Sequence, residues 1–290
     1  MRVGGRGTLC GWRAVRRVAR WQGAWRRRAV AREVGIVGKL SVLVGKELRQ
    51  VRWVLWVGLA VTLVFGLSLP YFYRFMARMA PSLGMLPGDL GELFRQQLAD
   101  YRVYLWANWY AKNLYQNLTV IALILGAGAV AGERSRGTLP FLLTLPVTRR
   151  QVITAKVVAG AAVLAACTVV PTLAVWASSP WLGGQRAFGT FLLGMPTAWA
   201  GALVVLAVAM LASAFTEDVV KAGIAATVAC LVLAVPGWFR SSYRLSIFWH
   251  MKGFPIAMGQ GFPWLSLLVL LGLAFLLLWA GAVLVARRDL

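Results

Sequence analysis

Six long apolar stretches alternate with shorter charged segments along this chain of 290 residues. A helix needs about 20 apolar residues to cross the roughly 30 Å of hydrocarbon in a bilayer. The stretches that lack Asp, Glu, Lys and Arg and are long enough to cross are residues 53–73, 113–132, 157–185, 187–216, 222–239 and 253–286. The pattern therefore predicts an all-α, polytopic membrane protein with six transmembrane helices.

A second pattern precedes the first apolar stretch. Apolar residues recur there at helical spacing, at Leu40, Val44, Leu48 and Val51. The charged residues between them point away from this stripe, at Lys46, Glu47, Arg49 and Arg52. We expect an interfacial helix that turns into the first span at Trp53. Residues 1–38 mix Arg with Gly, Ala and Trp, and we interpret them as a basic N-terminal extension, disordered or lying on the membrane surface; residues 39–290 form the membrane domain.

The third pattern is a segment too short to span. In residues 133–156 the charge-free part covers only residues 137–148. We expect Thr138 to cap a short helix that Pro146 ends, and Thr148 with Gln151 to make a capping box at the start of the third span. A short helix with an exposed apolar face is not stable alone in water, so it needs lipid or a protein partner.

Composition agrees with a membrane protein, since 60% of the residues are hydrophobic and only 14% are charged. The formal net charge of +22 also occurs in proteins that bind nucleic acid. Here, however, 14 of the 31 basic residues lie in residues 1–52, beside the first span. Membrane topology and anionic lipid account for them, and we expect membrane lipid rather than nucleic acid as a partner.

The distribution of Lys and Arg also predicts orientation, because these residues are retained on the cytoplasmic side near the ends of spans. Residues 1–52, residues 133–156 and the Arg287-Arg288 pair all lie on one side if there are six spans. We expect both termini and residues 133–156 to be cytoplasmic, in a multi-pass protein of the cell membrane. The loop 74–112 is then outside.

Aromatic residues gather at the expected outer ends of the spans. Trp106, Trp109 and Tyr110 follow a helical stripe in the loop 74–112, and the loop 237–262 carries further aromatic residues and the only histidine, His250. Trp and Tyr are enriched at membrane interfaces. We interpret both groups as an aromatic belt, with a substrate gate as the alternative.

The spans offer no evident catalytic or metal-binding set. No ionisable residue lies near a predicted midplane, and the chain has one histidine and no paired carboxylates there. Thr216 is expected to cap the fifth span, with Glu217 and Asp218 in its first turn. Gly128 and Gly132 form a GxxxG pattern that permits close helix packing.

The stretch "ERSRGTLPFLLTLPVTRRQVITAK" resembles the cytoplasmic loop of ABC-2 type transporter permeases. The residues that carry the resemblance are Glu133, Gly137, Thr138, Leu139, Leu142, Leu143, Pro146, Val147, Thr148, Arg149 and Lys156. "KELRQ", with Lys46, Glu47 and Arg49, is similar to the interfacial helix of that family, and the terminal "RRDL" to its usual ending. Pro140 departs from the pattern, where a polar or acidic residue is expected.

The resemblance implies that the short helix is a coupling helix, which docks in a groove of a separate ABC ATP-binding subunit. The chain would be a non-catalytic permease in an ATP-driven exporter, assembled as a dimer with a second copy or a homologous permease. It needs no cofactor of its own, because ATP and Mg²⁺ bind to the partner subunit. "GIVGKLS" at 35–41 does not have the spacing of a P-loop. The alternative is a secondary transporter or a membrane scaffold without an ATPase partner. The substrate and the residues that line its pathway stay open.

Overall fold

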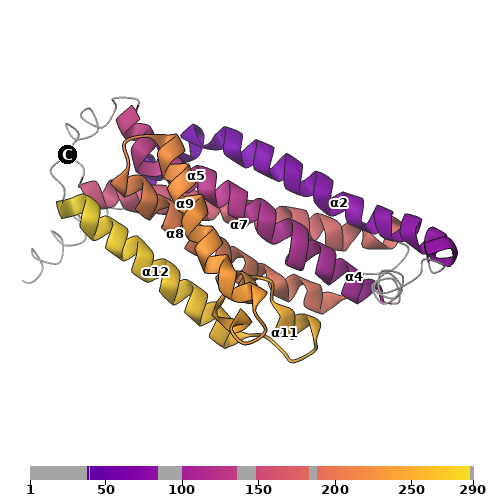
Figure 1. Ribbon diagram of the computed structural model, residues 1–290. Helices are drawn as coiled ribbons and strands as arrows, with labels where there is room; N and C mark the ends of the chain where they lie inside the picture. Colours follow the sequence, from indigo (N-terminus) through magenta and orange to yellow (C-terminus); the bar gives the residue numbers. More distant parts are fainter. Residues whose placement is uncertain (1–37, 39, 84–99, 136–147, 183–187, 288–290) are drawn as a thin grey trace, which may run out of the picture.

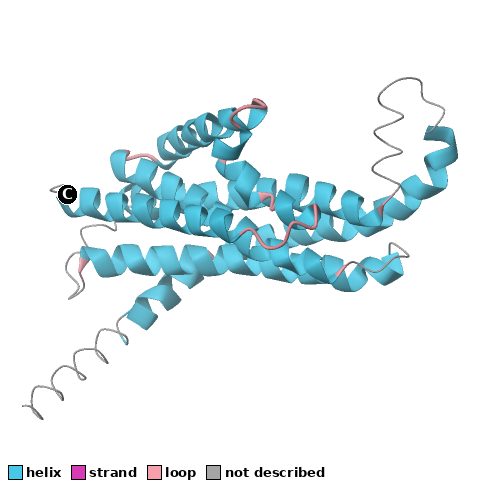
Figure 2. Ribbon diagram, turned by 90° about the horizontal axis from the view of Figure 1, so that it is seen from below, coloured by secondary structure: helices cyan, strands magenta, loops and turns pink. Residues whose placement is uncertain are grey.

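The computed structural model describes residues 38, 40–83, 100–135, 148–182 and 188–287, which form helices and loops without a strand (Figures 1 and 2). The N-terminal helix covers residues 40–50 and bends at Val51 into the first long helix. The remaining elements are α2 (Arg52–Leu83), α4 (Tyr101–Asn108), the π-helix η1 (Trp109–Leu114), α5 (Tyr115–Ser135), α7 (Arg149–Leu182), the 3-10 helix η2 (Gly189–Gly194), α8 (Met195–Phe215), α9 (Val219–Ala234), the 3-10 helices η3 (Val235–Trp238) and η4 (Tyr243–Leu245), α10 (Ile247–Met251), α11 (Phe254–Ala257) and α12 (Trp264–Arg287).

Six helical segments of the described chain are long and apolar enough to cross a membrane, so the predicted all-α fold with six spans is confirmed. They cover Arg52–Met79, Tyr101–Ser135, Arg150–Leu182, Gly189–Phe215, Val219–Trp238 and Trp264–Leu284. The second span begins at Tyr101, well before the predicted residue 113. Lys112 interrupts the apolar run in sequence, but its side chain is exposed on the outside of the helix, where it does not end the span.

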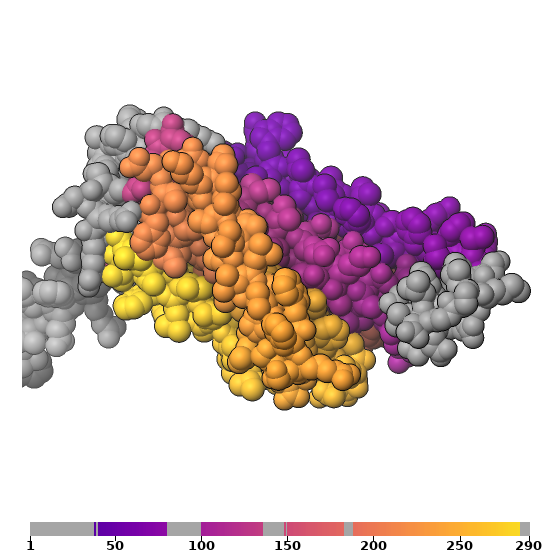
Figure 3. Space-filling model, in the orientation of Figure 1, coloured from indigo at the N-terminus to yellow at the C-terminus, as the bar shows by residue number. Residues whose placement is uncertain are grey.

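Helix α8 is the centre of the bundle. In its most apolar stretch 78% of the residues are buried, against 11% in the last span, which contains α12. Helices α5, α9 and α12 pack around α8, while α2 lies along α7 (Figure 1). Figure 3 shows α9 on the outside of the bundle, lying across the other helices. Because α8 is apolar on every side, it has no face that prefers water, as expected for a helix enclosed by other helices.

A close helix contact is found at Gly126, where α5 meets α8. A Cβ atom at Gly126 would lie 2.4 Å from Ala209 Cβ and 2.9 Å from the Leu206 carbonyl oxygen. The GxxxG interpretation of Gly128 and Gly132 is wrong as a packing motif, because a Cβ at Gly128 would meet nothing within 4 Å and one at Gly132 would only reach Val219 at 4.0 Å. Gly128 and Gly132 lie two and six residues after Gly126, which places both on the side of α5 away from the contact with Ala209.

The aromatic belt predicted before the second span is also wrong. Trp106, Trp109 and Tyr110 are buried in the core, at 2%, 0% and 1% exposure. Trp109 Nε1 donates to Thr172 Oγ1 at 3.1 Å, and the Tyr110 hydroxyl donates to the Phe191 carbonyl at 2.8 Å. Each polar tip therefore has a partner inside the protein, which removes the reason for these side chains to seek the membrane surface.

The segment between α9 and α12 folds back onto the bundle at the end that contains Trp106. Met251 is fully buried and would touch any side chain at Gly201 of α8. Trp106 Nε1 donates to the Lys252 carbonyl at 3.0 Å. The Lys252 ammonium lies 4.6 Å from the centre of the Tyr115 ring, and burial lowers the pKa of this lysine. The segment is thus a packed part of the protein.

The cap predicted for the fifth span is at a different residue. Asp218, not Thr216, is the N-cap of α9, and its carboxylate accepts hydrogen bonds from the backbone N–H groups of Val220 and Lys221 at 2.6 and 3.1 Å. The Thr216 hydroxyl instead donates to the Ala212 carbonyl in the last turn of α8. The helix starts two residues later than expected, because the backbone is extended at both Thr216 and Asp218.

Candidate functional site

Four charged side chains meet at the end of the bundle where α5 ends and α7 begins. The Lys156 ammonium donates hydrogen bonds of 2.9 Å to Glu47 Oε2 and of 2.9 Å to Glu133 Oε1. Lys46 Nζ lies 3.2 Å from Glu47 Oε1 and 3.7 Å from Glu133 Oε1. Two positive and two negative charges balance within this group, which we call the Lys156 cluster: Lys46, Glu47, Glu133 and Lys156.

Three members of the Lys156 cluster are buried. The side chain of Lys156 is 8% exposed, and those of Glu47 and Glu133 are 5% and 4% exposed. A buried charge is tolerated only when it is paired, and removing one partner of a buried pair typically costs about 3–5 kcal/mol. The cluster therefore holds the N-terminal helix against the last turn of α5 and the first turns of α7. These are the two helix ends that flank residues 136–147.

The position of Glu47 corrects one expectation. We placed it with Lys46, Arg49 and Arg52 on the face that points away from the membrane, but its side chain points into the bundle. Leu43, one turn earlier, is the buried apolar residue of this helix, whereas the expected stripe is only half-buried. The buried face is thus rotated by one position, because the pairing with Lys156 stabilises a carboxylate that would otherwise face water. Arg49 is exposed, as expected.

Helix α7 starts with the capping box that the sequence predicts. The backbone N–H of Thr148 donates to Gln151 Oε1 at 2.9 Å, and the N–H of Gln151 donates to Thr148 Oγ1 at 3.3 Å. This reciprocal pair is the predicted capping box. Helix α7 begins at Arg149, and Arg150 is exposed beside it. The capping box fixes where the chain enters the third span, two turns before Lys156.

Most of the predicted coupling segment lies outside the described residues. This holds for Gly137, Thr138, Leu139, Leu142, Leu143 and Pro146. Of the residues proposed for coupling, the structure describes Glu133, Thr148, Arg149 and Lys156 and brings Glu133 and Lys156 together. The role of the remaining residues stays a prediction.

One contact between helices was not foreseen from the sequence. The Ser213 hydroxyl of α8 accepts hydrogen bonds from the backbone N–H groups of Val130 and Ala131 in α5, at 3.0 and 2.8 Å. It donates to the Ala127 carbonyl at 2.9 Å. A hydroxyl that bridges two helices in this way fixes their relative position. The available signal was a serine among Ala, Leu and Phe, which is too common in membrane helices to single out.

Comparison with protein families decides the identity of the chain. A family model described as "ABC-2 family transporter protein" matches residues 41–242, which is more than two thirds of the chain. The chain belongs to this family. The match begins in the N-terminal helix and includes every residue of the Lys156 cluster. A search of curated proteins finds no match to the chain.

Membership defines the protein as a permease, the membrane component of a transporter, which is not itself catalytic. Permeases of the ABC-2 family generally work with ATP-binding subunits. Within the described ranges, no three His, Cys, Asp or Glu side chains lie close enough to hold a metal ion.

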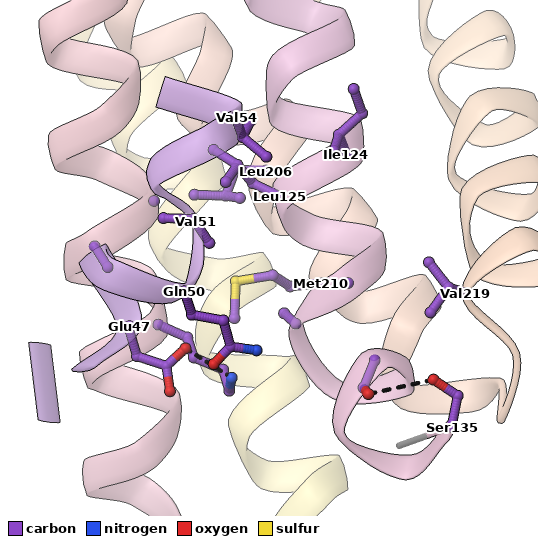
Figure 4. Close-up of a pocket in the computed structure, with 16 residues that line it drawn as sticks. Glu47, Gln50, Val51, Val54, Ile124, Leu125, Ser135, Leu206, Met210 and Val219 are labelled. Atoms are coloured by element: carbon purple, nitrogen blue, oxygen red, sulfur yellow. Dashed lines mark hydrogen bonds and ion pairs between the residues drawn. The ribbon is translucent and has the colours of Figure 1, made fainter. Parts of the chain in front are cut away.

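A hollow of about 310 Å³ opens beside the Lys156 cluster of the permease (Figure 4). Glu47 and Gln50 lie at one end of it, and Val54, Ile124 and Leu206 lie at the other. The space exists because α5 and α7 present small residues there, among them Gly128 and Gly132. The glycine pair that does not serve helix packing thus lines a cavity.

Proposed function

We propose that this ABC-2 permease is one half of the membrane part of an ATP-driven exporter, and that residues 133–156 couple it to a separate ATP-binding subunit. The observation that supports coupling is the Lys156 cluster. Its hydrogen bonds join the N-terminal helix to both helix ends that flank residues 136–147. A force applied to that segment would reach three helices at once, because rigid, paired side chains connect them.

The proposed mechanism is a rigid-body switch. ATP and Mg²⁺ bind to two partner subunits, whose approach on ATP binding displaces the coupling segments of two permeases. In each permease the capping box and the Lys156 cluster pass this displacement to α7, α5 and the N-terminal helix. The pathway then changes from inward-open to outward-open. In this arrangement both termini and residues 133–156 are cytoplasmic, in the cell membrane.

The test is the substitution Leu142→Asp, on the apolar face expected to enter a groove of the ATP-binding subunit. A carboxylate buried without a partner would cost about 3 kcal/mol, which weakens binding more than a hundredfold. We expect the variant to insert normally but to lose the ATP-binding subunit in pull-downs and to lose substrate-stimulated ATP hydrolysis. The matched control is Arg150→Ala, which removes a solvent-exposed charge next to the segment and should change affinity little.

Two results would overturn the proposal. In one, Leu142→Asp binds the ATP-binding subunit with wild-type affinity, so the segment does not dock there. In the other, the purified permease transports substrate in response to an ion gradient with no ATP-binding subunit present. The second result would favour a secondary transporter.

A further inference from the structure

The hollow beside the Lys156 cluster continues along the outside of α2 and α5. A second hollow of about 360 Å³ lies between these helices. Val54 and Ile124 line both hollows, so the two lie next to each other. Together they make one groove, which we call the α2–α5 groove, leading from the Lys156 cluster toward the middle of the bundle.

The α2–α5 groove is longer than one leaflet is deep. Its wall on α5 extends from Gly132 to Asn117. At 1.5 Å per residue this distance is about 22 Å, compared with about 15 Å for half of the hydrocarbon thickness of a bilayer. A hydrocarbon chain from one leaflet fits along it.

The lining of the groove changes from polar to apolar along its length. Glu47, Gln50, Ser135 and Lys156 line the end at the cluster. The body is formed by aliphatic side chains of α2 and α5, among them Val57, Val61, Val120 and Ile121. The amide of Asn117 marks the far end of this apolar surface. A molecule with one polar head and one long apolar chain matches the order of these surfaces.

Charge at the polar end selects the head group. The carboxylates of Glu47 and Glu133 are already paired with Lys156. Lys46, Arg49 and Arg52 do not line the groove, but they are exposed on the same N-terminal segment, so cations exceed carboxylates on the surface around its mouth. An anionic head is therefore favoured over a neutral or cationic one.

The open side of the groove faces outward. Trp53 and Val57, on its α2 wall, are 69% and 59% exposed, and in a bilayer such a surface contacts lipid. An amphiphile in the membrane can therefore enter sideways, without crossing water. We infer that the α2–α5 groove binds a hydrocarbon chain of an anionic phospholipid, with its phosphate beside Gln50 and Lys156.

This inference deepens the proposed function by naming a lipid-like amphiphile as the substrate class. It rests on that function for the transport step only, since binding can be measured on the permease alone. The probe is phosphatidylglycerol, compared with phosphatidylcholine of the same acyl chains. Native mass spectrometry of the purified, full-length permease counts the lipids retained.

The decisive variant is Gly128→Leu, which fills the groove at a position where a Cβ meets nothing within 4 Å. Its matched control is Gly272→Leu, at an exposed helical glycine of α12 that also has open space. We expect Gly128→Leu to reduce the affinity for phosphatidylglycerol about tenfold, a loss of about 1.4 kcal/mol, and Gly272→Leu to leave it unchanged. Equal retention by the two variants would overturn the inference.

A charge pair at Gln50 tests the head group without touching the buried cluster. Gln50 is exposed, so both substitutions leave the fold intact. Gln50→Glu should weaken phosphatidylglycerol binding several-fold and Gln50→Lys should not weaken it, while phosphatidylcholine binds poorly to all three proteins. Retention of phosphatidylcholine at the level of phosphatidylglycerol would refute the anionic head. If the permease binds oleate but not phosphatidylglycerol, the inference that the ligand is a phospholipid is refuted.

The outcomes separate the two proposals. If the Gly128 and Gln50 substitutions leave lipid retention unchanged while the ATP-binding subunit still co-purifies, the groove inference fails and the proposed function stands. If lipid retention follows the expected pattern but no ATP-binding subunit associates, the groove stands and the proposed function fails.

Discussion

Lys156 of α7 donates a hydrogen bond of 2.9 Å to Glu47, a residue 109 positions earlier in the chain. The pair is buried, and Lys156 also bonds Glu133. Lys156→Met would leave two carboxylates buried close together, with only the more exposed Lys46 to pair them. We expect this substitution to destabilise the permease by roughly 3–5 kcal/mol, seen as a lower midpoint in thermal unfolding of the detergent-solubilised protein.

Lys46→Met is the control for this prediction, because it makes the same change in the same cluster at a side chain that is 43% exposed. It should cost far less. Combining Lys156→Met with Glu47→Gln should cost less than the sum of the two single substitutions, because the second change neutralises one of the carboxylates left behind. Strict additivity would show that the hydrogen bond contributes no coupling energy.

The contact between α5 and α8 predicts opposite effects of alanine at two glycines of one helix. At Gly126 a methyl group would lie 2.4 Å from Ala209 Cβ, with backbone atoms of α8 behind it, so Gly126→Ala must push the helices apart and destabilise the protein. At Gly128 a methyl group meets nothing within 4 Å, so Gly128→Ala should be neutral or stabilise the helix by up to about 1 kcal/mol. Thermal unfolding of the two variants compares them directly, and equal midpoints would contradict the close contact.

The position of the cap of α9 is testable in the same way. Asp218→Ala removes the acceptor for two backbone N–H groups and should cost about 1 kcal/mol. Thr216→Val removes a hydroxyl that bonds within the last turn of α8 and should cost less. The reverse order of the two thermal midpoints would restore Thr216 as the cap.

Orientation in the membrane can be measured at two exposed arginines on opposite ends of the bundle. After replacement of the native cysteines, Arg150→Cys and Arg240→Cys introduce single accessible thiols. The bias of Lys and Arg predicts that a membrane-impermeant maleimide labels residue 240 but not residue 150 in intact cells. Labelling of residue 150 but not of residue 240 would show that the orientation is opposite to the predicted one.

Hydropathy was enough to predict the spans, because the thickness of the bilayer requires a long apolar run wherever the chain crosses. The error at the second span shows the limit of counting charges. Lys112 ended the predicted loop, yet the helix continues through it, since a lysine side chain can extend along the helix surface toward water.

Sequence reasoning was weakest on which side of each helix faces the protein. Inside a membrane both the neighbouring helices and the lipid are apolar. The periodicity of apolar residues therefore hardly distinguishes the side of a helix that faces the protein from the side that faces lipid. Trp109 and Tyr110 are residue types that are typical of the membrane interface, but both lie in the core. Glu47 is charged and was expected to face solvent, but it is buried because it pairs with Lys156. That partner is distant in the chain, so the pairing could not be predicted. Such pairings depend on tertiary contacts that a single sequence does not reveal, whereas the local capping box of Thr148 and Gln151 was predictable.

The Ser213 bridge has a consequence for how the protein is made. A nascent chain is synthesised from its N-terminus, and its segments enter the membrane roughly in that order. The face of α5 that contains Ala127, Val130 and Ala131 is therefore in the bilayer before α8 has been translated. Until Ser213 arrives, that face has only lipid or the translocation machinery to cover it. Biogenesis thus contains a waiting period, and a delay in synthesis between the second and fourth spans would prolong the exposure of α5 to quality-control proteases.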